Sequence, residues 1–392
     1  MSAPNVESPR GSRFARPTLQ IAEGDSPIFA ARKLGQSPRE LGHSPSWPNV
    51  LLAGKLTALD SPGGGEIQML ATARALESVG VRARLWRPWE ERLRGADCLH
   101  LFGSLPEHLP VVETARRQNV PVVLSTIAWF DLGSYWREPP SAAKRLAACV
   151  RFLARAGCPR LPSWRRRLYH AVDLVMPNSN AEAEQLIRYF QVPAERIHVV
   201  PNGADVRLAQ PDPEPFVRLV GTRGFVLSAG RIEPRKNQLG VLRAVRGTKL
   251  PVVVLGDVVP GYEWYALRCR READPEHVRF VGRLDYDDPL LAAAYAACGC
   301  LVLASWYETP GLVALEAGMS GVPLVLPERG CAREYFGGEA AYVKAGDTAG
   351  IRRAIVDALR RGRSPALARL VRGNFSWTAA ARATREGYQK VI

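Results

Sequence analysis

The sequence has no run of apolar residues long enough to cross a lipid bilayer, which takes roughly 18 to 20 residues. Its first residues, MSAPNVE, also lack the apolar core of a signal peptide. From these two absences we expect a cytoplasmic protein.

Cysteine pairs of the C-x-x-C type are missing as well. The seven cysteines are odd in number and scattered, most of them within apolar segments. This distribution fits buried thiols in a reducing compartment. Cys298 and Cys300 lie where a helix of small residues runs into a strand, so we expect no metal site there.

Two familiar nucleotide-binding patterns are absent from the glycine-rich turn at residues 61–66 (SPGGGE). The turn matches neither G-x-G-x-x-G nor the P-loop pattern that ends in Gly-Lys-Ser/Thr. This argues against a dinucleotide oxidoreductase and a P-loop nucleotidase. No nucleic-acid-binding motif is visible, and we expect no nucleic-acid partner.

Positive charge is what the chain has in excess. It contains 53 Lys and Arg against 38 Asp and Glu, for a formal net charge of +15. Such a balance favours anionic partners: nucleotides, phospholipid surfaces, acidic saccharides or nucleic acid. Charge alone does not choose among them.

Short apolar runs alternate with helical stretches in most of the chain. Residues 1–47 are the exception, rich in Pro, Ser, Gly and Arg, and we expect a disordered tail there. The runs that predict strands lie at residues 50–54, 81–86, 98–102, 120–125, 174–177 and 197–201 and, beyond a proline-rich break at 210–215, at 225–230, 251–256, 278–282, 300–304 and 323–327. This alternation predicts βαβ units and parallel sheets. We expect an α/β protein with two Rossmann-like domains, residues 48–212 and 213–375, facing a central cleft.

Two glutamates separated by seven residues, Glu308 and Glu316, follow one of the predicted strands. Glu308 lies in the loop after residues 300–304, and Glu316 lies about one and a half turns into the next helix. Both can face the crevice at the carboxyl ends of the strands, with the free N–H groups of a helix start between them. The pattern fits a nucleotide-sugar site, and it fits equally an exposed loop residue and a solvated helix residue.

Two cations follow the first strand of the second predicted domain. Arg231 leaves the strand end and Lys236 enters the next helix, so both can converge on a diphosphate. Such a pair can stabilise a departing nucleoside diphosphate without a metal. A solvated basic loop is the alternative.

Three glycines, Gly63, Gly64 and Gly65, open a helix after the first strand. Glycine there lets backbone N–H groups approach a phosphate or a sugar closely. A glycine-rich turn is weak evidence when taken alone.

Two other motifs have structural explanations. Ser179 and Glu182 are spaced as a capping box at a helix start. Asp287 or Asp288 precedes a proline at the first turn of another helix, as a helix cap does, and we favour that role over metal binding.

Taken in order, these segments resemble the retaining glycosyltransferases of family 4, also called glycosyl transferases group 1, which have the two-domain GT-B fold. The likeness spans roughly residues 50–392. The features that carry it are the Gly63 to Gly65 turn, Ser179 with its helix, Asn202-Gly203, Gly230-Arg231, Lys236-Asn237, Gly282, and Glu308 with Glu316.

The resemblance implies a role for each site residue. Glu316 would bind the donor ribose and Glu308 the hydroxyls of the transferred sugar, while Arg231 and Lys236 would bind the diphosphate. The remaining donor-side residues would be Gly230, Asn237, Gly311 and Leu312.

The resemblance also implies the reaction. A hexose-type sugar would pass from a nucleoside-diphosphate sugar to a saccharide or lipid-linked acceptor, as in envelope or exopolysaccharide synthesis. The anomeric configuration would be retained, with no metal or other cofactor. A closing helix in residues 376–392 would cross back onto the first domain.

The chain departs from the family pattern in two places. Many members have Glu-Gly-Phe-Gly where residues 308–311 are ETPG, which changes the loop near the sugar. Members often carry a histidine after the fourth strand, but residues 125–131 (STIAWFD) contain none. In our interpretation Asp131 or Trp129 occupies that side of the sugar. The histidines for which we expect structural roles are His100 and His170.

Residues 144–167 predict a basic amphipathic surface in the first domain. The cations on one helical face are Lys144, Arg151 and Arg155, and the apolar residues opposite are Leu146, Val150 and Leu153. Near anionic lipid each cation contributes about 1 kcal/mol, so the pattern predicts peripheral docking on the inner face of a membrane. A packed helix with a solvated face is equally compatible with it.

Two other function classes remain open at this point. A nucleotide-sugar epimerase or hydrolase of the same fold would need no acceptor. A non-catalytic protein that binds nucleotide sugars or nucleic acid would need no reaction at all.

Overall fold

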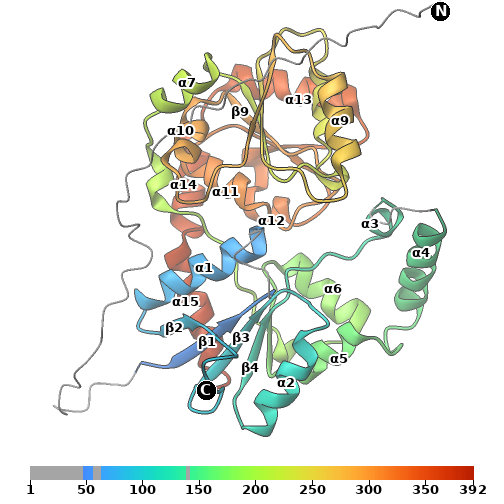
Figure 1. Cartoon of the computed structure of the whole chain (residues 1–392), viewed down its shortest axis with the longest axis vertical. Coiled ribbons are helices and arrows are strands. Elements are labelled where there is room, and N and C mark those ends of the chain that lie inside the picture. Colours follow the sequence, from blue (N-terminus) through green and yellow to red (C-terminus); the bar gives the residue numbers. More distant parts are fainter. Residues whose placement is uncertain (1–46, 56–62, 138–141) are drawn as a thin grey trace, which may run out of the picture. The chain divides into compact units, whose positions relative to one another are not determined.

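The computed structural model of the protein describes residues 47–392, apart from 56–62 and 138–141 (Figure 1). Residues 47–392 form one compact unit. The tail predicted for residues 1–47 lies outside the described residues, except for Trp47. The unit contains two sheets, and all paired strands within them are parallel.

The first sheet has five strands in the order β2-β1-β3-β4-β5. They are β1 (Asn49–Ala53), β2 (Arg82–Leu85), β3 (Cys98–Phe102), β4 (Val122–Ser125) and β5 (Leu174–Met176). The helices of this part are α1 (Gly64–Glu77), α2 (His108–Arg117), α3 (Leu132–Arg137), α4 (Ala142–Gly157), α5 (Trp164–Ala171) and α6 (Asn180–Phe190).

Both faces of the first sheet are buried, because successive strand residues point to opposite faces. Val50 and Leu52 pack in one cluster with Met69 of α1. Leu51, between them, packs in another cluster with residues of α2, α5 and α6. Burial on both faces explains why β1, β3, β4 and β5 are largely apolar in the sequence. The edge strand β2 (RARL) is only partly buried and alternates Arg with apolar residues.

The second sheet has six strands in the order β11-β10-β9-β6-β7-β8. They are β6 (Val226–Ala229), β7 (Val252–Leu255), β8 (Val278–Gly282), β9 (Cys300–Val302), β10 (Leu324–Pro327) and β11 (Ala340–Val343). The helices of this part are α7 (Glu214–Val220), α8 (Gln238–Val245), α9 (Glu263–Glu272), α10 (Pro289–Ala297), α11 (Leu312–Met319), α12 (Ala332–Phe336), α13 (Thr348–Arg361) and α14 (Pro365–Asn374). The prediction of two parallel α/β sheets is therefore confirmed.

Two strand predictions differ from the structure. Residues 197–201 make an isolated bridge between Ile197 and Val175 rather than a strand, because Pro177 has no N–H and ends β5. The edge strand β11 (AAYV) was not predicted, because it is only four residues long and begins with two alanines, which are depleted in strands.

The last helix, α15 (Trp377–Tyr388), follows the second sheet in the chain but packs against α1. Its Tyr388 belongs to a buried cluster of the first sheet. The chain reaches it past residue 204, where the Ala204 amide donates to the Phe375 carbonyl at 2.8 Å. A Cβ on Gly203 would overlap the Trp377 backbone nitrogen, so glycine permits this close approach. The division at residues 212 and 213 stays a prediction.

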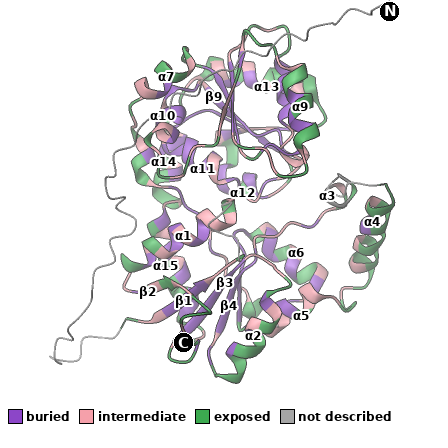
Figure 2. Ribbon diagram, in the orientation of Figure 1, coloured by how far each residue is buried: buried purple, intermediate pink, exposed green. Residues whose placement is uncertain are grey.

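Exposure separates one helix from the rest of the first part of the chain. Figure 2 shows β1, β3 and β4 mostly buried and α4 largely exposed. In the part of the chain that the structure describes, no helix has the combination of length and apolarity that crossing a bilayer requires.

Candidate functional site

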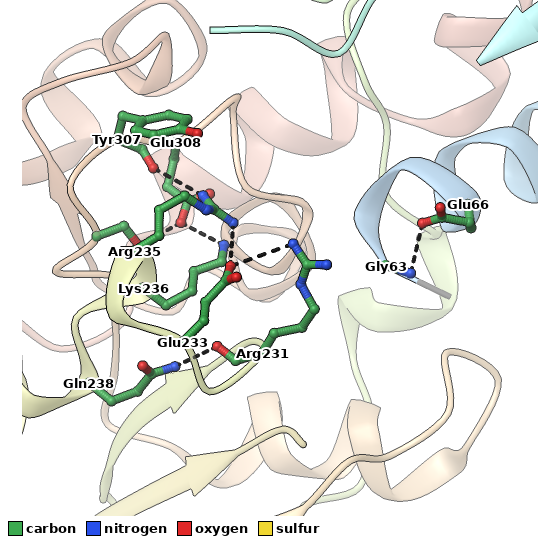
Figure 3. A network of polar contacts seen from close by, with 10 residues as sticks. Gly63, Glu66, Arg231, Glu233, Arg235, Lys236, Gln238, Tyr307 and Glu308 are labelled. Carbon is green, nitrogen blue, oxygen red and sulfur yellow. Dashed lines mark hydrogen bonds and ion pairs between the residues drawn. The ribbon is translucent and has the colours of Figure 1, made fainter. Parts of the chain in front are cut away.

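A buried ion pair lies at the carboxyl ends of β6 and β9. The Lys236 Nζ atom is 2.6 Å from Glu308 Oε1 (Figure 3). Ser305 donates its hydroxyl to the same oxygen, also at 2.6 Å. Burial by itself would raise the pKa of Glu308, but the charges of Lys236 and Arg235 hold it below its ordinary value. Glu308 is therefore an ionised carboxylate with a fixed orientation.

Arg231 lies beside this pair and extends toward the glycine turn. Its side chain is 55 % exposed, and its Nη1 atom is 3.6 Å from the place where a Cβ of Gly63 would lie. Glu233 Oε1 is 3.5 Å from Arg231 Nη2 and accepts a hydrogen bond of 2.9 Å from Arg235 (Figure 3). Arg231 thus keeps most of its charge available to a ligand.

The sequence did not single out Arg235. Its guanidinium lies 5.2 Å from the ring centroid of Tyr307 and contributes to the charge around Glu308. The feature of the sequence that could have indicated a place for Arg235 in the site is its position between Arg231 and Lys236.

The glycine turn begins α1 and meets segments from both sheets. The Gly63 amide donates to Glu66 Oε2 at 2.8 Å. A Cβ on Gly64 would lie 3.8 Å from Leu312 Cδ1, and one on Gly65 would lie 3.2 Å from a side-chain carbon of Ile127. The turn therefore adjoins the first residue of α11.

Glu316 has a protein partner in this structure. It is buried on α11, and Tyr295 donates its hydroxyl to Glu316 Oε2 at 2.5 Å. Burial raises the pKa of Glu316 to about 7, although the hydrogen bond opposes this shift. Gly311, which precedes α11, has a φ of 83°, and a Cβ there would lie 3.4 Å from Glu308 Oε2. The ribose-binding role of Glu316 stays a prediction.

Two predicted site residues are engaged with the protein itself. The Asn237 side-chain amide donates to the carbonyls of Ala304 and Ala345, at 2.9 and 2.8 Å. Asp131 accepts from Trp129 Nε1 at 2.8 Å and lies 3.5 Å from Arg329. It lines a second cavity and not the one beside Arg231. Of these two candidates for one side of the sugar, only Trp129 lines the first cavity.

A cavity of about 450 Å³ joins the glycine turn to Arg231. Its other walls are the end of β3 with residues 103–105 and the segment 127–130. Its charged lining residues are Lys55, Glu66, Arg165 and Arg231, so cations predominate. We call this space the acceptor-side cavity, after the acceptor role that the sequence predicts for the first domain.

Arg165 was assigned from the sequence to the basic surface, but it lines the acceptor-side cavity. Its guanidinium lies 4.3 Å from the ring centroid of Trp164, a contact that fixes a cation by its attraction to the aromatic face. Arg155 is likewise engaged, donating to the Pro159 carbonyl at 3.0 Å. The basic surface predicted at residues 144–167 is thus smaller than expected.

The apolar face of α4 is exposed. The exposed fractions are 60 % for Leu146, 55 % for Val150 and 56 % for Leu153. These residues recur at the spacing of one helical face.

The motifs assigned structural roles mostly keep them. The Ser179 hydroxyl caps α6 by accepting from the Glu182 amide at 3.1 Å, and Asp288 caps α10 by accepting from the Leu290 amide at 2.8 Å. The Glu182 side chain does not complete the capping box, because it accepts from the Asn178 amide and from residues after β4.

The two histidines are structural, as expected. His100 bonds the Tyr388 hydroxyl and Ser125 Oγ, and His170 bonds the Phe190 carbonyl. Within the described ranges, no group of three or more His, Cys, Asp or Glu residues is arranged to hold a metal ion.

Two family models match the chain in succession. The model described as Glycosyltransferase Family 4 matches residues 63–208, and the one described as Glycosyl transferases group 1 matches residues 213–370. Among curated proteins, a D-inositol 3-phosphate glycosyltransferase of Arthrobacter sp. (strain FB24) is 26 % identical, over 85 % of this chain and 93 % of the relative. A glycogen synthase of Mycobacterium tuberculosis is 28 % identical, over 81 % of this chain and 74 % of the relative.

Solved structures share the fold. HepE from Anabaena, in complex with UDP and glucose, has a TM-score of 0.63 at 17 % identity, covering 88 % of this chain and 99 % of that one. Sucrose-phosphate synthase from Thermosynechococcus elongatus has a TM-score of 0.65 at 19 % identity, with the same coverage.

Proposed function

The chain belongs to the family 4 glycosyltransferases, also called glycosyl transferases group 1, which have the GT-B fold, and we propose that it moves a hexose-type sugar from a nucleoside-diphosphate sugar to a hydroxyl group of a saccharide or lipid-linked acceptor. The observation that carries this proposal is the position of the Lys236–Glu308 pair and Arg231. They lie at the carboxyl ends of β6 and β9, and Arg231 lines the acceptor-side cavity.

In this proposal the two cations bind the donor diphosphate, and Glu308 binds hydroxyls of the transferred sugar. The acceptor oxygen forms a bond to the anomeric carbon on the face from which the nucleoside diphosphate departs. The bond from that carbon to the diphosphate breaks, and its electron pair stays on the leaving oxygen. The acceptor's proton passes to the leaving phosphate, and the anomeric configuration is retained.

The charge that develops on the leaving diphosphate is stabilised by Arg231 and Lys236, because cations that are already in position need little reorganisation during the reaction. We therefore propose a reaction without a metal. The expected result is that excess EDTA leaves the rate unchanged, and a rate lost with EDTA and restored by Mg²⁺ or Mn²⁺ would contradict this part of the proposal.

The similar proteins suggest which substrates to try first. HepE was solved with UDP and glucose, which supports UDP-sugars as donors. One relative is named for D-inositol 3-phosphate, and the cations that line the acceptor-side cavity suit an acceptor that carries an anionic group. A place in envelope or exopolysaccharide synthesis would follow from a saccharide or lipid-linked acceptor.

The donor can be tested by thermal shift against UDP-, GDP-, ADP- and dTDP-sugars. A ligand present at 100 times its Kd, and bound only by the folded state, adds about 2.7 kcal/mol of stability. Arg231→Ala and Glu316→Gln should remove most of the shift that the correct donor produces. The matched control is Arg218→Ala, an exposed arginine on α7, which should keep it. Undiminished shifts in both site variants would mean that the donor binds elsewhere.

Product analysis separates the transferase from the other enzymes of this fold. With the donor alone, an epimerase isomerises the sugar and a hydrolase releases it, whereas a transferase releases nucleoside diphosphate efficiently only when an acceptor is added. Equal release with and without saccharide acceptors would favour hydrolysis.

We further propose that α4 docks the enzyme on an anionic membrane surface. The helix exposes Leu146, Val150 and Leu153 on one face, and Arg151 and Arg160 are exposed nearby. Apolar side chains can enter the headgroup region while cations bind anionic lipid. This surface lies in the same part of the chain as the acceptor-side cavity, which suits a lipid-linked acceptor.

Sedimentation with vesicles tests this docking. The wild-type chain should pellet with phosphatidylcholine vesicles that contain phosphatidylglycerol, and not with phosphatidylcholine alone. Leu153→Glu should abolish pelleting. Leu267→Glu is the matched control, because Leu267 on α9 is also 56 % exposed. Equal pelleting with both vesicle types, or none with either, would contradict the proposal.

A further inference from the structure

One wall of the acceptor-side cavity is held in an unfavourable backbone conformation. Ile127, which follows β4 closely, has a φ of 46°, and it lines the cavity. A β-branched residue at positive φ is an outlier, because its Cβ substituents collide with the backbone. The other non-glycine residues with positive φ in the described ranges, none of them β-branched, are Asn119, Gln191, Asn237 and Lys249. Strain of this kind persists only where the surroundings enforce it.

Glu182 on α6 bonds both neighbours of Ile127. Its Oε1 atom accepts from the Thr126 hydroxyl at 2.6 Å and from the Ala128 amide at 2.6 Å. Its Oε2 atom accepts from the Asn178 amide at 2.9 Å. The side chain is fully buried. Burial raises its pKa to about 7, and this shift is opposed by hydrogen bonds from Thr126, Asn178 and Ala128 and by no cation among the described residues. Burying a carboxylate without a neighbouring cation is costly. The hydrogen bonds that Glu182 accepts from the cavity wall offset this cost.

Gln185 holds the same wall one turn further along α6. Its Oε1 atom accepts from the Phe130 amide at 2.8 Å. Residues three apart on a helix lie on the same face, so Glu182 and Gln185 bind the segment 126–130 at successive points. We call these two residues the α6 pair.

The strained residue faces the glycine turn. A Cβ on Gly65 would lie 3.2 Å from Ile127 Cδ1, and both residues line the acceptor-side cavity. A wall residue that relaxed to negative φ would move its side chain and both adjoining peptide groups within this space.

We propose that Glu182 and Gln185 are positioning residues: they hold the segment 126–130 in the conformation that binds the acceptor, and they touch neither substrate. This inference rests on the proposed function, because it takes the acceptor-side cavity to be the place where the acceptor binds. It assigns the pair to acceptor binding and not to donor binding.

Amide hydrogen exchange tests the positioning without any substrate. Glu182→Ala should speed exchange at Ala128 by about tenfold, as expected when one hydrogen bond is lost. Gln185→Ala should act on Phe130 instead. Glu184→Ala, an exposed glutamate on the same helix, should change neither. Equal exchange at these amides in all variants, or a uniform increase throughout the chain, would overturn the proposal.

Kinetics then test the functional half, with the donor and acceptor that turn over in the assays above. Glu182→Ala should raise the KM for the acceptor by about tenfold, with the KM for the donor unchanged. Glu182→Gln keeps the length and one acceptor oxygen and should restore part of the loss. A merely structural role would lower the active fraction and leave both KM values unchanged, which would overturn the proposal, as would an equal rise in both.

The variant Ile127→Gly tests whether backbone strain at residue 127 is what Glu182 opposes. Glycine adopts positive φ without penalty, so in Ile127→Gly the substitution Glu182→Ala should raise the acceptor KM less than in the wild type. An equal rise in both backgrounds would show that strain is not what Glu182 opposes. A wild-type chain that binds no sugar nucleotide would count against the proposed function, whereas the exchange results would still decide whether the α6 pair holds the wall.

Discussion

At the scale of single residues, the chemistry is concentrated in a few buried charges. The Lys236–Glu308 pair is nearly excluded from solvent, with side-chain exposures of 14 % and 4 %. Removing one partner of such a pair leaves a buried charge uncompensated, which is more costly than losing the attraction itself.

Lys236→Met should therefore destabilise the fold by about 3 kcal/mol, as measured by urea unfolding. The control is Arg243→Met, which breaks an ion pair with Glu272 at the surface and should cost less than about 1 kcal/mol. Equal costs for the two variants would mean that Glu308 finds another partner when Lys236 is absent.

Glu316 makes stability depend on pH. Burial raises its pKa from 4.5 to about 7 in the folded protein. The carboxyl therefore contributes stability that is fully present below pH 4.5 and is lost as the pH rises through 7. Glu316→Gln cannot ionise, so its unfolding free energy relative to wild type should rise by on the order of 3 kcal/mol across this window. A constant difference between the two proteins from pH 4 to 8 would show that Glu316 has no such shift.

The residues of the site differ in how far their positions could be predicted. Lys236 and Glu308 follow strands β6 and β9, which pair directly, so their closeness follows from the parallel topology. Arg165 comes from α5, and no spacing in the sequence brings it to the carboxyl ends of the strands. Glu182 has the spacing of a helix cap, and the sequence does not show that its side chain turns to the segment after β4.

At the scale of helices and strands, the alternation of apolar runs predicted most of the sheet strands. It failed at the edges. The strand β11 has four residues, two of them alanine, and no alternation of polar and apolar residues, so the sequence did not indicate a strand there. Residues 197–201 have the pattern of a strand but lie beside a proline that interrupts the ladder.

The passage from the second sheet to α15 depends on one glycine. Gly203→Ala should destabilise the fold by about 1 to 3 kcal/mol, because the new Cβ overlaps the backbone of Trp377. Gly373→Ala is the control, since a Cβ there meets nothing within 4 Å and alanine favours the helix. Thermal unfolding measures both. Equal melting temperatures for the two variants would mean that the chain can move apart at residue 203 without cost.

At the scale of the whole molecule, the net charge of +15 and the cations that line the acceptor-side cavity both attract anionic ligands. Added salt screens such fields, and the screening length falls from about 10 Å at 0.1 M to about 3 Å at 1 M.

Affinity for an anionic sugar nucleotide should accordingly fall several-fold between low and high salt. Affinity for the uncharged nucleoside should change little, because it lacks the phosphates that we propose Arg231 and Lys236 bind. Calorimetry at several salt concentrations measures both, and an equal loss for the two ligands would point to a general effect on folding.

The packing of α15 also bears on the order in which the protein can mature during translation. Synthesis runs from the N-terminus and domains generally fold as they emerge, but Tyr388, a buried partner of His100 in the first sheet, is made after every strand of the second sheet. Until α15 has been synthesised, the apolar surface of the first sheet that α15 covers therefore stays exposed. We expect that face to be the natural client surface for chaperones, and a chain released before residue 377 to remain bound to them.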